Sequence, residues 1–166
     1  MNPDHHLRKE AWISGVSNAI FNGLIAWLLL RNGPELAWGG QSSFAFDVLA
    51  TAFILPFIVA LIVIPLQRGK LRKGKLESIA LGPENRFQKF ADRLPHNTFK
   101  SALCFGLSGL CTIAPLTLLG FYILDIDSVR PTTYSIFKGI WAGLMAAALV
   151  VPMVLVALRP TTNKEV

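Results

Sequence analysis

The chain has 166 residues, of which 52% are hydrophobic and only 16% are charged, whereas a soluble domain carries about 25% charged residues. Four segments contain no Asp, Glu, Lys or Arg, and each is long enough to cross a hydrocarbon core of about 30 Å as a helix: 11–30, 48–67, 101–124 and 139–158. This pattern excludes an ordinary soluble enzyme, a disordered chain and a disulfide scaffold, and it predicts an all-α polytopic membrane protein with a single membrane domain over residues 1–166.

Four transmembrane helices are expected, arranged as two tandem hairpins and covering approximately 10–31, 44–67, 99–124 and 134–158. Asn32-Gly33-Pro34 is a strong breaker after the first helix. The first segment is longer than the apolar core of a secretory signal peptide, so we interpret it as a retained anchor. His5 and His6 precede it in a tail that we expect to be flexible.

Prolines lie inside the other three predicted helices, and Pro56 falls near the middle of the second. Proline lacks an N–H and its ring clashes with the preceding turn, so each is expected to kink its helix. The others are Pro65, Pro115 and Pro152.

The basic residues are distributed asymmetrically between the segments that connect the helices. The two ends of the chain and the 68–100 segment hold 13 Lys and Arg, against two, Arg31 and Arg130, in the other two connections. Basic residues in short loops remain cytoplasmic, so we expect both termini and the long loop in the cytoplasm. Attraction to anionic lipid headgroups accounts for the basic loop, so no nucleic-acid partner is expected.

The loop over 68–98 contains a predicted amphipathic helix. Phe87, Phe90 and Leu94 recur at helical spacing after Pro83, and charged residues take the other faces, as in helices that lie in the membrane interface. Pro95 is expected to end this helix. Its role is either simple anchoring or the sensing of a lipid or partner.

A shift of 91 residues overlays the first predicted hairpin on the second. Gly15 and Ser17 fall on Gly106 and Ser108, and Phe46 falls on Phe137. Chance similarity and a tandem duplication both remain open, and a duplication would give parallel copies related by an axis along the membrane normal.

Small residues recur every fourth position on the first and fourth predicted helices. Such ladders let helix backbones approach closely within lipid. They predict helix packing within one chain or between chains, and we expect a homo-oligomer. The residues are Gly15, Ala19 and Gly23, and Gly139, Gly143 and Ala147.

Two asparagines, Asn18 and Asn22, lie in the predicted hydrocarbon region on one face of the first helix. An unbonded amide is unfavourable there, so both should face the bundle interior, either as glue between helices or in contact with a substrate. A shorter polar ladder, Cys104, Ser108 and Thr112, lies on the third helix. Its hydroxyls either bond to the backbone of their own helix or form part of a polar track.

Asp47 and Lys138 are charges inside the predicted helices, each about one turn from the outer end and separated by the same 91 residues. Three interpretations remain open. They are exposed interfacial residues that reach water, a structural ion pair, or an ion- or proton-coupled site.

No spacing typical of a metal site, a nucleotide-binding loop, a haem site or a nucleophile–base pair occurs. We therefore expect no catalytic residue, metal or cofactor. Cys104 and Cys111 are seven residues apart on one predicted helix, too far for a mutual disulfide.

The Leu94-Pro95 lead-in, the prolines in the second helix of each hairpin and the basic stop Gln67-Arg68-Gly69-Lys70 make the chain similar to small bacterial inner-membrane proteins described as permease-like. The resemblance implies a multi-pass inner-membrane location. The function expected is a transport- or channel-type protein for a small solute or ion. The alternative is a non-catalytic assembly subunit of a larger membrane complex.

Overall fold

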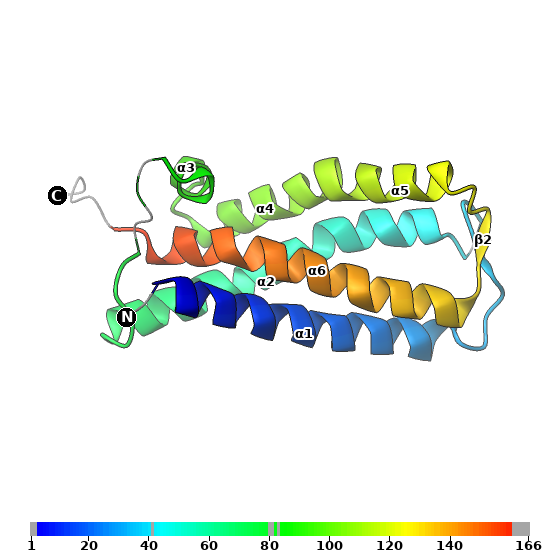
Figure 1. The fold of residues 1–166 in the computed structure, drawn as a ribbon, viewed down its shortest axis with the longest axis horizontal. Helices are drawn as coiled ribbons and strands as arrows, with labels where there is room; N and C mark the ends of the chain where they lie inside the picture. Colours follow the sequence, from blue (N-terminus) through cyan, green and yellow to red (C-terminus); the bar gives the residue numbers. More distant parts are fainter. Residues whose placement is uncertain (1–2, 41, 80–81, 83, 161–166) are drawn as a thin grey trace.

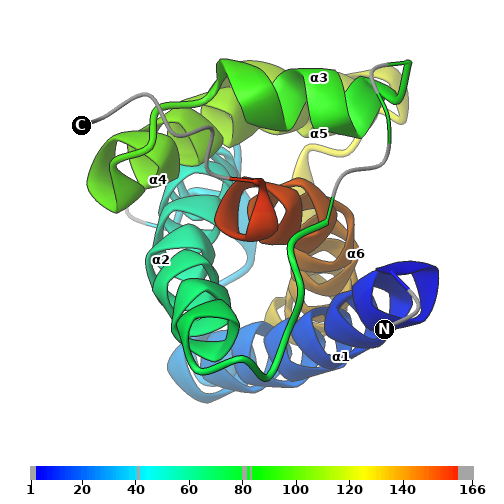
Figure 2. The same ribbon diagram turned by 90° about the vertical axis from the view of Figure 1, so that its left-hand side faces the viewer.

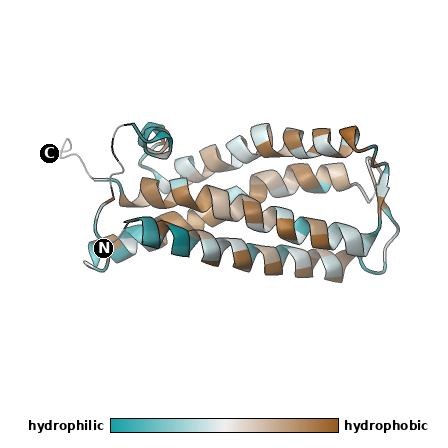
Figure 3. Cartoon of the chain, in the orientation of Figure 1, coloured by the Kyte–Doolittle hydropathy of each residue, from teal (hydrophilic) through white to brown (hydrophobic). Residues whose placement is uncertain are grey.

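The computed structural model describes residues 3–40, 42–79, 82 and 84–160. Four helical spans in it are long and apolar enough to cross a membrane, which confirms the predicted all-α membrane architecture. They are α1 (Pro3–Leu30), α2 (Phe44–Arg72), a third span (Thr98–Ile123) and α6 (Pro131–Leu158). Figure 3 shows hydrophobic residues along the spans and hydrophilic residues at the end that carries α3.

The third span is continuous but not uniform. It consists of α4 (Thr98–Ser108), the π-helical turn η1 (Gly109–Ile113) and α5 (Ala114–Ile123). The π turn ends two residues before Pro115, which has no N–H to donate to the preceding turn. The sequence predicts a helix with an internal proline here, but not the wider turn.

Short elements mark the two ends of the bundle (Figure 1). At one end, which we call the strand end, β1 (Leu36–Ala37) pairs antiparallel with β2 (Ser128–Val129). The opposite end carries α3 (Arg86–Arg93), the start of α1 and the end of α6, and we call it the α3 end.

Two helices extend further than the charge-free segments indicate. α1 begins at Pro3, so His5 and His6 belong to the helix, and the prediction of a flexible tail is wrong. α2 continues to Arg72. A charge-free segment marks the part of a helix that contacts hydrocarbon, whereas the helix itself continues beyond it. Proline at the first position and Asp4 in the first turn favour the early start of α1.

α6 occupies the centre of the bundle. α1 packs along α6, α6 packs against α2, and α2 packs against the third span, as the end-on view shows (Figure 2). The principal partner of α1 is therefore the last helix and not the helix that follows it in the chain. In keeping with this position, the stretch of α6 from Pro152 to Leu158 is buried throughout.

The two ladders of small residues pack against each other within one chain. A Cβ added to Gly143 would lie 2.8 Å from both the Ala19 Cβ and the Gly15 carbonyl oxygen, and one added to Gly139 would lie 2.9 Å from the Ala19 carbonyl oxygen. Gly23 likewise approaches the Gly139 backbone. The absence of side chains at these positions sets the close approach of α1 and α6.

α3 lies across the α3 end and packs on the bundle (Figure 2). Ala91 and Leu94 are buried, and the Phe90 ring lies 5.9 Å from the ring of Phe105. The Arg159 Nη1 donates to the carbonyl oxygens of Ala91 and Leu94, at 3.1 and 2.9 Å. Of the residues predicted for an interfacial helix, Pro83 and the side chain of Phe87 lie outside the described part of the structure.

Arg159 follows the last span and is itself buried. Burial lowers the pKa of its guanidinium, and the nearby Asp92 carboxylate opposes this shift. An arginine remains cationic under such a shift, so Arg159 supplies a fixed positive charge at the C-terminal end of α3, where the helix dipole favours it.

The close approach of α1 and α6 gives a first prediction. Gly143→Ala should lower the free energy of unfolding by about 1–3 kcal/mol, because the added methyl overlaps α1. The measurement is the SDS-induced unfolding of the protein in mixed micelles, followed by far-UV circular dichroism. Gly120→Ala is the matched control, since a Cβ there meets no atom within 4 Å, and it should change stability by less than about 0.5 kcal/mol.

Candidate functional site

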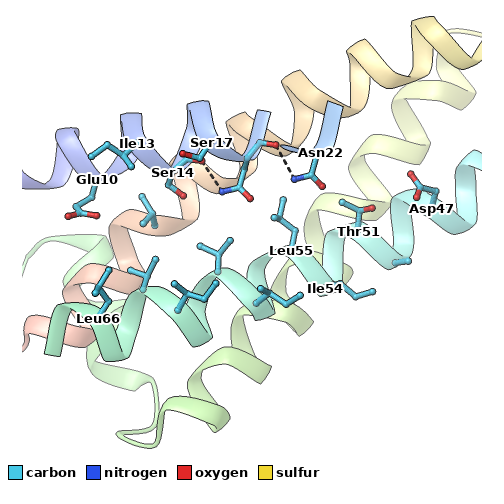
Figure 4. Close-up of a pocket in the computed structure, with 17 residues that line it drawn as sticks. Glu10, Ile13, Ser14, Ser17, Asn22, Asp47, Thr51, Ile54, Leu55 and Leu66 are labelled. Carbon is cyan, nitrogen blue, oxygen red and sulfur yellow. Dashed lines mark hydrogen bonds between the residues drawn. The ribbon is translucent and has the colours of Figure 1, made fainter. Parts of the chain in front are cut away.

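A groove of about 510 Å³ separates α1 from α2 (Figure 4). It exists because α1 packs on α6 and leaves its flank toward α2 unfilled. We call it the α1–α2 groove. It is lined by Glu10, Ile13, Ser14, Ser17, Asn18 and Asn22 from α1, by Asp47, Ala50, Thr51, Ile54, Leu55, Ile58, Val59, Ile62, Val63 and Leu66 from α2, and by Val150 from α6.

The α1 wall of the groove is polar. Asn18 donates its side-chain N–H to the Ser14 carbonyl oxygen at 2.8 Å, and Asn22 donates to the Asn18 carbonyl oxygen at 3.0 Å. A carbonyl oxygen can only accept, so the amide nitrogens must face the backbone. The amide oxygens of Asn18 and Asn22 are therefore left for the groove. Both predicted residues lie in this wall.

Three hydroxyls add to this polar surface. Within the described part of the chain, the side chains of Ser14, Ser17 and Thr51 make no hydrogen bond. Hydroxyl and amide groups in an apolar region are unfavourable by several kcal/mol without a partner. The groove therefore presents five polar side chains whose hydrogen-bonding capacity water or a ligand would satisfy.

The α2 wall is apolar, apart from Thr51 and the terminal Asp47. Its Ile54, Ile58, Ile62 and Leu66 side chains stand one helical turn apart and are each about half exposed. The groove is thus open along its side, and it offers a polar strip facing an apolar strip.

At the strand end, Asp47 and Lys138 form the ion pair that was one of the sequence-based interpretations. The Lys138 Nζ lies 2.7 and 2.8 Å from the two Asp47 carboxylate oxygens, and the Tyr134 hydroxyl donates to the same carboxylate at 2.6 Å. Only 13% of the Lys138 side chain is exposed. This pair links α2 to α6, with Asp47 at the mouth of the groove.

Local structure at the strand end holds these residues in place. Ser43 caps α2: its hydroxyl accepts from the Phe46 N–H at 3.2 Å and donates to the Trp38 carbonyl oxygen at 2.6 Å. Phe44 is fully buried against Trp38 and Phe121. The first turn of α2, which carries Asp47, is therefore tightly fixed.

A second ionic cluster at the α3 end was missed by the sequence analysis. The Lys70 Nζ lies 3.3 Å from Glu10 Oε1, and the His6 Nε2 lies 3.3 Å from Gln67 Oε1 and 3.9 Å from Glu10 Oε1. These contacts join α1 to α2. Glu10 lies at the start of the first predicted helix and Lys70 lies beyond the end of the second, so only the extension of both helices brings them together.

The predicted polar ladder of the third span does not reach the groove. The Ser108 hydroxyl donates to the Phe105 carbonyl oxygen, and the Thr112 hydroxyl donates to the Ser108 carbonyl oxygen. Cys104 is partly buried and has a free thiol. This ladder is therefore satisfied by its own helix backbone, one of the two alternatives considered for it.

Comparison with protein-family models, with curated proteins and with solved structures finds no match. Among the described residues there is no group of three or more His, Cys, Asp or Glu that could hold a metal ion. The candidate functional site is therefore the groove, together with the ionic clusters at its two ends.

The Asp47–Lys138 pair gives a second prediction. Asp47→Asn and Lys138→Ala should each destabilise the protein by about 2 kcal/mol, because each leaves a partly buried partner unpaired. The double variant should be more stable than the sum of the two losses predicts, by about 1 kcal/mol or more. SDS-induced unfolding of the four proteins measures this coupling, and strictly additive losses would contradict it.

Proposed function

We propose that this protein is a transport-type membrane protein that carries a small solute or ion along the α1–α2 groove. One observation carries the proposal: polar groups without protein partners line a cavity inside the predicted hydrocarbon region. Hydrocarbon provides no hydrogen-bond partner for such groups. A polar path for a solute through the membrane would explain their presence. Binding and conduction require no catalytic group, and we assign none.

The two ionic clusters support this proposal. One links α1 to α2 at the α3 end, and the other links α2 to α6 at the strand end. Each involves α2, which carries Pro56 and Pro65 within the helix. Proline removes backbone hydrogen bonds and allows a helix to bend, so movement of α2 would open or close the groove at either end.

We infer that the α3 end is cytoplasmic and that the protein is a multi-pass protein of an inner, plasma-type membrane with both termini inside. The 13-to-2 distribution of basic residues supports this orientation. We also propose that the two halves of the chain are related by the 91-residue shift, and the support is a symmetric pattern of helix packing. Each first span packs on the second span of the other hairpin, α1 on α6 and the third span on α2.

The second candidate is a non-catalytic assembly subunit. The lateral opening of the groove favours it, because Ile58 and Ile62 are 47% and 59% exposed and a helix of another membrane protein could lie there. Self-association through small-residue helix faces remains a prediction under either candidate. The small-residue faces of α1 and α6 already cover each other, so a second copy would need a different surface or a separation of these helices.

Cysteine accessibility separates the two candidates and gives a third prediction. In a background with Cys104 and Cys111 replaced by Ala, Ser14→Cys and Asn22→Cys should react in intact membranes with charged, membrane-impermeant thiosulfonates. A solute path must admit water and polar molecules. Thr112→Cys is the matched control at a comparable position on the third span, where it lies outside the groove, and it should remain unreactive.

A cysteine at the exposed position Ser128 verifies that the reagents are active. Reaction at Ser128→Cys without reaction at either groove position would overturn the transport proposal and leave the assembly subunit. Reaction at the groove positions would show that neither lipid nor a partner blocks them. It would exclude a groove that is permanently occupied by another helix.

A further inference from the structure

The α1–α2 groove has a marked charge preference. Its lining contains two carboxylates, Glu10 and Asp47, and no Lys, Arg or His among the described residues. We propose that its ligand is an amphiphilic organic cation, a protonated amine with an apolar chain, whose ammonium group binds at Glu10. The binding step is independently measurable, whereas carriage of this ligand rests on the proposed function.

The two carboxylates are not equally available. Both Asp47 oxygens lie within 2.8 Å of the Lys138 ammonium, and the Tyr134 hydroxyl adds a third short contact. Lys138 is almost enclosed, so it cannot leave for water at low cost. Asp47 is therefore neutralised in place and serves as the fixed end of the groove.

Glu10 is held much less firmly. Its Oε1 lies 3.3 Å from the Lys70 Nζ and 3.9 Å from the His6 Nε2, and its other carboxylate oxygen has no partner within the described part of the chain. The Lys70 side chain is 35% exposed at the rim, whereas that of Glu10 is only 16% exposed. A ligand ammonium can therefore replace Lys70, because the lysine regains hydration while the glutamate remains paired.

Hydrogen-bond acceptors continue from Glu10 along the same face of α1. Ser14 follows by one turn, and Ser17 and Asn18 by two. An ammonium group donates up to three hydrogen bonds, and the Glu10 carboxylate with these neighbouring oxygens matches that demand. A carboxylate or phosphate ligand would instead place its charge beside the carboxylates of Glu10 and Asp47, since the lysines paired with them, Lys70 and Lys138, are not part of the groove lining.

The remainder of the groove fits an apolar chain. The α2 strip of Ile54, Ile58, Ile62 and Leu66 lines the same groove as these polar residues. A volume of about 510 Å³ is within the range of sites for small organic molecules, roughly 300–1,000 Å³. The half-exposed isoleucines leave a route of entry from the lipid, in which an amphiphile concentrates.

The test measures binding without any gradient, on the full-length protein in phosphatidylcholine nanodiscs. Radiolabelled decylammonium is compared with decanol and decanoate, which have the same chain and differ in charge, and protein-free nanodiscs correct for partitioning. We expect saturable binding of decylammonium only. Saturable binding of decanoate, or equal binding of all three, would overturn the proposal.

Variants of the Glu10–Lys70 pair give the fourth prediction. Glu10→Gln should weaken decylammonium binding by about tenfold or more, whereas Lys70→Met should strengthen it by about threefold, because Lys70 competes for the same carboxylate. A purely structural contact between α1 and α2 would make both variants weaker. Glu84→Gln and Lys75→Met are the matched controls, because both side chains are exposed and lie in the connection between α2 and the third span. Neither change should alter decylammonium binding.

Two further measurements distinguish failure of the ligand assignment from failure of the transport proposal. Phosphatidylethanolamine in the nanodisc also presents an ammonium group, and loss of decylammonium binding in its presence would assign the groove to lipid and overturn a free amphiphile as its ligand. Flux of decylammonium into proteoliposomes tests carriage. Binding without flux would retain this ligand assignment and contradict the transport proposal.

Discussion

The structure depends on one constraint: hydrocarbon forms no hydrogen bonds, so polar groups within the spans must find partners inside the protein. The third span meets this constraint through its own backbone, as the bonds of Ser108 and Thr112 show. Trp141 meets it by donating to the Thr117 hydroxyl at 3.0 Å. Against this background, the side-chain oxygens on α1 that have no partner among the described residues are the exception, and they gather along the α1–α2 groove.

The exception follows from how α1 is packed. Each small residue of its ladder directly follows a polar residue in the sequence. The pairs are Ser14-Gly15, Asn18-Ala19 and Asn22-Gly23. Successive residues of a helix are rotated by about 100°, so a small face fixed against α6 turns the polar face toward α2. The same contact that anchors α1 therefore creates the groove and determines its lining.

The positions of the spans could be predicted from the local sequence, but the packing between them could not. Absent charges locate the spans, and the four-residue spacing of Asn18 and Asn22 places them on one face. A sequence alone does not state which helices pack together, so neither the central position of α6 nor the direct contact of the two small ladders could be derived. The Glu10–Lys70 contact was missed for a related reason. Charge marks the edge of hydrocarbon, whereas both residues lie on helices that continue beyond that edge.

The acidic residues at the two ends of the groove differ in how firmly they are held. At the strand end, three contacts of 2.8 Å or less surround Asp47, and Ser43, buried aromatic rings and the paired strands brace it. At the α3 end, α1 and α2 are joined by contacts of 3.3 Å or longer, one of them made by a partly exposed lysine. Weak, partly hydrated ion pairs contribute little to stability, so the contacts between α1 and α2 at the α3 end are the ones that would be lost at the least cost in free energy. The proposed ligand anchor, Glu10, lies at the end that opens with the least loss of structure.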